Sequence, residues 1–162
     1  MKVENFEAER PGLEIDEYFD GKTMAWGIFE DRFGNLRRQF IVDIEGACDD
    51  GCLKLDETFL YSDGEREKRT WNLRKTGDRS WQGQADDVVG IAVGEAGGNA
   101  FHLKYRMDLK MKKRTLRVSF DDWMFLQPSG VLLSRTKVRK FGLALGTVTL
   151  FFQKAAESAL AN

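Results

Sequence analysis

The chain has 162 residues, of which 25 are Lys or Arg and 26 are Asp or Glu, giving a formal net charge of −1 at pH 7. This length corresponds to a single domain with one core. A nearly neutral total excludes binding to nucleic acid or an anionic membrane through the overall field. No membrane span is predicted, because the longest apolar run, residues 143–152, is about half of the roughly 20 residues required.

The first twenty residues scatter apolar and acidic side chains without a period, so residues 1–20 are expected to cap one end of the fold. The segment MKVENFEAERPG has no apolar core of a secretory signal, which leads us to expect a cytoplasmic protein. From Gly21 onward the pattern changes to period two. Leu36, Phe40, Val42 and Ile44 fall on one face of a predicted hairpin strand.

The next segments also read as strands joined by turns. Asp63-Gly64 separates two alternating runs and predicts a hairpin with a type I′ turn. The Gly-rich stretch ADDVVGIAVGEAGGNA lacks the Lys-Ser/Thr ending of a phosphate loop, so its glycines are expected to form bulges and a barrel corner. Lys110, Lys112, Lys113 and Arg114 are interpreted as a solvated turn rather than a polyanion site.

Sequential strands without intervening helices predict an all-β fold, a single antiparallel meander barrel of about nine or ten strands over residues 1–162. Closure of the barrel removes the exposed edges that so many twisted strands would otherwise leave. Residues 154–162 are expected to form a tail or short helix. Cys48 and Cys52 lack the further ligands of a zinc site, so free thiols are favoured over a disulfide, and no metal or cofactor is predicted.

Four charged residues fall, by alternation, on the face that otherwise carries apolar side chains: Arg38, Glu57, Asp122 and Arg135. A lone buried charge is costly, so these acids and bases are expected to meet one another or water. Two interpretations stay open. The charges either form a network of ion pairs that fixes the barrel register, or they line a ligand pocket.

Several segments together resemble the bacterial domain of unknown function family 3833, from Phe19 to Lys154. They are FDGKTMAWGIFEDRFG, RRQFIVDIEG, LDETFLYSDGE, ADDVVGIAVGEAGGNA, FDDWMFL and KFGLALGTVTLFF. The resemblance implies a lipocalin-like or calycin-type barrel without an established activity, and many members are envelope lipoproteins. Its pattern includes Glu57, Asp122 and Arg135. The chain departs from it at Cys48, where a tryptophan is expected, and at Ser134, where asparagine is common.

The leading functional hypothesis is a carrier or sensor that binds a small amphipathic, lipid-like anionic ligand inside the barrel. Phe40, Phe59, Tyr105 and Met124 would contact its apolar part, and Arg38 or Arg135 its anionic head.

Two alternatives belong to other classes. One is an isomerase or hydratase that uses Glu57 or Asp122 as a general base. The other is an interaction module without a ligand, in which exposed aromatics such as Phe125 and Phe151 mark an interface, with a homodimer as one form.

Overall fold

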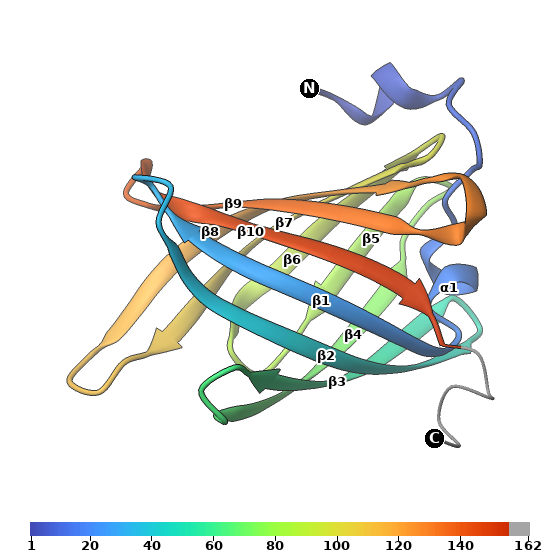
Figure 1. Cartoon of the computed structure of the whole chain (residues 1–162). Coiled ribbons are helices and arrows are strands. Elements are labelled where there is room, and N and C mark those ends of the chain that lie inside the picture. The colour runs from blue at the N-terminus through green and yellow to red at the C-terminus, as the bar shows by residue number, and fades with distance from the viewer. Residues whose placement is uncertain (156–162) are drawn as a thin grey trace.

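The computed structural model describes residues 1–155 and shows an all-β closed barrel of ten antiparallel strands (Figure 1). The strands are β1 (Gly21–Asp31), β2 (Leu36–Asp49), β3 (Cys52–Tyr61), β4 (Arg66–Lys75), β5 (Ser80–Gln84), β6 (Val88–Gly97), β7 (Ala100–Lys110), β8 (Thr115–Leu126), β9 (Leu132–Lys140) and β10 (Leu143–Lys154). Each strand pairs with its successor, and β1 closes the ring against β10. The predicted meander barrel is confirmed.

Alternation places the core inside the ring. Ala25, Val42, Ile44, Leu53 and Phe101 point inward and are almost completely buried. Because every strand has two hydrogen-bonded neighbours, the sheet has no open edge along its length.

The N-terminal residues cover one end and part of one side of the barrel. The short helix α1 (Ile15–Tyr18) lies across the end, and the ring of Phe19 packs edge-on against Phe152 of β10. The 3₁₀ turn η1 (Val3–Phe6) lies against the outer face, where Phe6 contacts Trp123. The predicted tail or helix over residues 154–162 lies, from residue 156 onward, outside the described residues.

The hairpin turns keep the predicted positions, with one difference in geometry. Only Gly64 has a positive φ in the β3–β4 turn, at 90°, so the turn is not of type I′. Asp63, whose φ is not positive, accepts a hydrogen bond of 2.9 Å from the Glu65 amide through its carboxylate. The predicted bulge in the Gly-rich stretch is present, because pairing between β6 and β7 shifts register between Val89 and Val93.

The two cysteines and the helices were also the subject of expectations from the sequence. Cys48 and Cys52 are both exposed free thiols at the β2–β3 turn. Among residues 1–155 no helix is long and apolar enough to cross a membrane.

Candidate functional site

The barrel encloses a cavity of about 990 Å³ that runs along its axis. At one end the cavity is closed by the buried side chains of Ile15 and Phe19 from the cap. At the other end its lining includes Glu65, Asp86 and Met111, which are exposed at the hairpin turns, so this end is the mouth. The volume lies at the upper end of the roughly 300–1,000 Å³ typical of small-molecule pockets.

The structure brings most of the predicted site residues together around this cavity. The residues that line it are Arg38, Phe40, Glu57, Phe59, Tyr105, Asp122 and Met124. They come from two pairs of neighbouring strands, β2 with β3 and β7 with β8, which lie on opposite sides of the ring. Their shared cavity supports the pocket interpretation.

Arg135 is the exception, and its predicted inward orientation is wrong. Its side chain is exposed on the outer face, while its neighbours Ser134 and Thr136 are buried and point inward. In β9 the outward positions hold Arg135, Lys137 and Arg139 together with Leu133, and the inward positions hold two small hydroxyl residues between Leu132 and Val138, so the three bases mark the solvent face although one leucine shares it. A shift of one residue in the alternation then exchanges inside and outside.

Glu57 is the most unusual polar residue of the cavity wall. It is half-buried as a whole, but its Oε1 atom is fully buried and has no hydrogen-bond partner. Burial raises the pKa of Glu57 to about 7, an effect that the nearby Arg69 guanidinium opposes and that Asp87 and Asp122 reinforce. Glu57 is therefore a cavity carboxyl that can hold or release a proton near neutral pH.

Asp122 lies close enough to Glu57 for their charges to interact. It is only 6% exposed, and its Oδ1 accepts a hydrogen bond of 2.7 Å from the Ser134 hydroxyl. Burial raises the pKa of Asp122, while hydrogen bonds from Ser134 and Thr136 act in the opposite direction. Ser134 thus bonds a residue that lines the cavity.

Ion pairs among the four charged residues, one of the two interpretations left open, do not form within residues 1–155. Arg38 turns toward the mouth, where its Nη2 lies 2.9 Å from Glu65 and 3.4 Å from Asp63. Within residues 1–155, Glu57 and Asp122 take part in no ion pair. The interior charges of the described residues therefore do not form the ion-pair network that would fix the barrel register.

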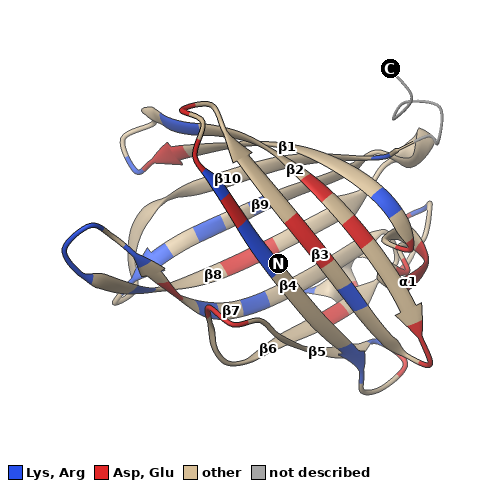
Figure 2. Cartoon of the chain, turned by 90° about the horizontal axis from the view of Figure 1, so that it is seen from below, with Lys and Arg blue, Asp and Glu red and all other residues tan. Residues whose placement is uncertain are grey.

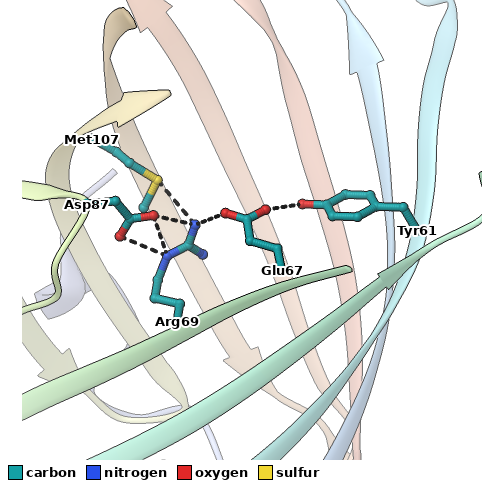
Figure 3. Close-up of polar contacts among 5 residues, drawn as sticks. All are labelled: Tyr61, Glu67, Arg69, Asp87 and Met107. Atoms are coloured by element: carbon teal, nitrogen blue, oxygen red, sulfur yellow. Dashed lines mark hydrogen bonds and ion pairs between the residues drawn. The ribbon is translucent and has the colours of Figure 1, made fainter. Parts of the chain in front are cut away.

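Sequence analysis missed a polar cluster centred on Arg69 of β4 (Figure 3). Its guanidinium donates to Asp87, with Nη2 2.9 Å from Oδ2, and to Glu67 at 3.3 Å. Tyr61 Oη in turn donates to Glu67 at 2.9 Å. Glu67 and Arg69 occupy every second position of β4 and so share the inward face with Trp71. The period-two pattern of the sequence already placed both side chains in the cavity wall.

Aromatic side chains surround these polar groups. The rings of Tyr105 and Phe120 stack with centroids 4.9 Å apart, and Trp71 meets Tyr105 edge-on at 5.1 Å. The Arg38 guanidinium lies 3.6 Å from the centroid of Tyr61. Such faces attract cations as well as apolar groups.

The lining is acidic overall. Its acids are Glu57, Glu65, Glu67, Asp86, Asp87, Asp108 and Asp122, and its bases are Arg38, Lys68, Arg69 and Lys110. Both arginines are engaged by carboxylates. An additional anion would therefore find mainly the exposed Lys68 and Lys110 at the mouth.

Comparison with known proteins identifies the family and supports the fold. The profile of the family described as "Protein of unknown function (DUF3833)" matches residues 1–154, so the chain belongs to this family. No curated protein matches the chain. Among solved structures, the S-type phycobiliprotein lyase CPES from Guillardia theta is similar, with a TM-score of 0.65 and 11% identity over 97% of this chain and 99% of that one. This likeness is one of fold.

Proposed function

We propose that this member of the DUF3833 family binds a small, largely apolar molecule inside its barrel, as a carrier or sensor. The observation that carries the proposal is the cavity itself, about 990 Å³, with an apolar closed end and a few polar groups at mid-height. Pockets with this composition bury the apolar body of a ligand and orient it through few polar contacts. The fold likeness to a phycobiliprotein lyase agrees with a barrel of this kind but gives no substrate.

The charged residues of the cavity bear on whether the polar group of the ligand is an anion or a cation. The anionic head expected from Arg38 and Arg135 fits the geometry less well than a cation does. Arg135 faces outward, Arg38 is paired, and the unpartnered atom deep in the wall is a carboxylate oxygen of Glu57. A protonated amine would pair with the Glu57 carboxylate, which lines the cavity, and lie against the aromatic rings around it. We therefore favour a lipophilic amine over a fatty acid.

Displacement of the neutral dye Nile red from the full chain tests both steps. The competitors are dodecylamine, dodecanol and dodecanoate, which share one apolar chain and differ only in the polar group. A hydrogen bond to a charged group contributes about 1.5–3 kcal/mol, so dodecylamine should bind at least about tenfold tighter than dodecanol. Glu57→Gln should remove this preference, and Glu45→Gln, at an exposed residue of β2, should keep it.

The outcomes separate the two steps. If neither Nile red nor any competitor binds, the cavity is not a ligand site and the proposal fails. If dodecanoate binds most tightly, or if Glu57→Gln leaves the amine preference intact, the cavity binds ligands but the assignment to amines is wrong.

An enzyme is the second candidate, and one observation favours it. Glu57 combines a pKa of about 7 with a position in the cavity wall, which suits a general base for isomerisation or hydration. Such a base would take a proton from a bound substrate and return it. Once a reaction is found, its rate should fall in Glu57→Gln and Asp122→Asn. An unchanged rate in both variants would exclude this mechanism.

The interaction module, the homodimer and the cytoplasmic location remain predictions. Of the two aromatics proposed for an interface, Phe125 is covered by Phe6 of the same chain, with centroids 5.1 Å apart, while Phe151 is 40% exposed. Light scattering of the full chain decides between monomer and dimer.

A further inference from the structure

The five hairpin turns around the cavity mouth are of two chemically different kinds. Three of them, at residues 32–35, 110–114 and 139–142, contain basic residues, and the acid next to the first of them, Asp31 at the end of β1, is already bonded by Arg37 and by two amides of the turn. The other two, at residues 62–65 and 85–87, contain acidic residues and no base. In the ring of strands the three basic turns are consecutive, because β2, β1, β10, β9, β8 and β7 follow one another. The mouth therefore has a basic side and an acidic side.

Large apolar side chains stand out from the same three turns. Phe33 is 75% exposed and Phe141 is 91% exposed, and Met111, Leu36 and Leu143 are also exposed. The turn at residues 32–35 lies beside the start of β10, which follows the turn at 139–142, because the Arg32 amide donates to the Leu145 carbonyl at 3.0 Å. All of these turns lie at the end of the barrel opposite α1 (Figure 1). An apolar rim of this kind is costly in water unless it meets another apolar phase.

The bases of the rim are available for an external partner. Among residues 1–155, Arg32, Lys112, Lys113, Arg114 and Lys140 form no ion pair. Arg32 and Lys140 lie over the neighbouring rings of Phe33 and Phe141, each 4.7 Å from the centroid. The β7–β8 turn is visible as a mostly blue loop, in which Met111 lies between Lys110 and the run of Lys112, Lys113 and Arg114 (Figure 2). Charge and apolar surface are thus interleaved in one place.

We propose that the basic side of the mouth, formed by the three turns at residues 32–35, 110–114 and 139–142, docks onto an anionic phospholipid surface. Phe33, Met111 and Phe141 would enter the headgroup and upper acyl region, and the lysines and arginines would contact lipid phosphates. The cavity would then open toward the bilayer, since Lys110 and Met111 belong to both the rim and the cavity lining.

A bilayer explains the rim better than a soluble polyanion does. Nucleic acids and other polyanions are held by bases and by stacking on aromatic faces, and they give no reason for an exposed methionine and leucine beside the rings. The nearly neutral total charge also makes binding depend on this local patch rather than on the whole protein. Interfacial anchors, in contrast, combine an apolar tip with flanking bases.

Flotation of the full chain with vesicles tests the proposal without any cavity ligand. Binding is expected to phosphatidylcholine vesicles that contain phosphatidylglycerol, to be much weaker with phosphatidylcholine alone, and to fall as salt rises. Lys112→Gln/Lys113→Gln should weaken binding about fivefold for each charge removed. The matched control Lys22→Gln/Lys54→Gln removes two exposed charges at the opposite end of the barrel and should leave binding unchanged.

A second variant separates a bilayer from a polyanion. Phe33→Ser/Phe141→Asn keeps every charge, and asparagine accepts the positive φ of residue 141, so folding is not at risk. It should reduce vesicle binding at least about tenfold and leave binding to heparin unchanged. The proposal is overturned if the parent chain does not bind anionic vesicles. It is also overturned if the control lysine variant loses as much vesicle binding as the rim lysine variant, or if the Phe33→Ser/Phe141→Asn variant binds vesicles as tightly as the parent.

Discussion

Glu57 and Arg69 face each other directly across β3 and β4, yet the guanidinium turns away from this carboxyl to bond Asp87 and Glu67. The Oε1 atom of Glu57 is consequently buried without a partner. Arg69 is half-buried and already forms ion pairs with Glu67 and Asp87. It therefore interacts with Glu57 only through its charge, without a hydrogen bond. This arrangement leaves one acid of the cavity wall without an ion-pair partner among residues 1–155.

The first prediction concerns the pKa of Glu57 when its neighbours change. Arg69→Gln removes the charge that lowers this pKa and should raise it further. Asp87→Asn removes a charge that raises it, and also frees Arg69, so it should lower the pKa. Carbon-detected NMR titration of the side-chain carboxyl measures both. Shifts in the same direction for the two variants would contradict the assignment of these charges to Glu57.

Stability should depend on pH through Glu57. Its pKa is about 7 in the folded chain against 4.5 for an ordinary Glu, so the folded state binds the proton more tightly. The stabilisation from this proton is complete below the unfolded value and is lost as pH rises toward 7. Gln at residue 57 does not titrate, so the Glu57→Gln variant does not lose stability in this way as pH rises. Its stability relative to the parent should therefore increase by about 3 kcal/mol between about pH 4 and pH 8.

Urea unfolding of the two proteins across this range gives the measurement. Asp122 is present in both, so its own titration largely cancels in the difference. A difference in unfolding free energy that stays constant with pH would mean that Glu57 titrates in the folded chain at its ordinary value.

Ser134 is predicted to stabilise the fold through Asp122. Ser134→Ala removes the 2.7 Å donor of a buried carboxylate and should cost about 1–3 kcal/mol in the free energy of unfolding. It should also raise the pKa of Asp122, because the hydroxyl lowers it. Ser119→Ala is the control, since that hydroxyl is exposed and bonds a carbonyl at 3.3 Å. If both variants lose the same free energy of unfolding, the hydrogen bond from Ser134 to Asp122 does not stabilise the fold more than an exposed one does.

The fold could be predicted because each strand shows a period of two and the strands follow one another without helices. Leu53, Leu55 and Phe59 alternate so regularly that their inward face is unambiguous, and Glu57 is placed with them. The β9 strand shows a contrast as well, because Arg135, Lys137 and Arg139 share its solvent face, but Leu133 lies on that face too and the inward assignment of Arg135 followed the leucine. The three bases, and not the single leucine, mark the outer face of this strand, and a slip of one residue exchanges the two faces.

The partners of the site residues could not be predicted in the same way. Arg69 bonds Asp87, which lies 18 residues further along the chain and enters the cavity from the β5–β6 turn. Which carboxylate a guanidinium reaches depends on side-chain direction and on the curvature of the barrel, and neither is encoded in the period of one strand. The choice of Asp87 over Glu57 is therefore a property of the closed structure.

The last prediction concerns the closed end of the cavity. A Cβ at residue 46 would lie 1.6 Å from the carbonyl oxygen of Phe19, so Gly46 permits the close approach of the cap to β2. Gly46→Ala should displace the cap at a cost of about 1–3 kcal/mol. It should also speed hydrogen exchange of the Phe19 amide, which bonds the Ile15 carbonyl at 3.0 Å. Gly77→Ala is the control, because its Cβ would meet only Ser80 at 3.7 Å.

If Gly46→Ala costs no more than Gly77→Ala and leaves Phe19 protected, the cap does not depend on this contact. If it loses protection at Phe19 while the strands keep theirs, the cap opens as a local unit. The cap at the closed end of the cavity would then be the part of the chain that unfolds first. Ligands that occupy the apolar end should restore the hydrogen-exchange protection of the Phe19 amide.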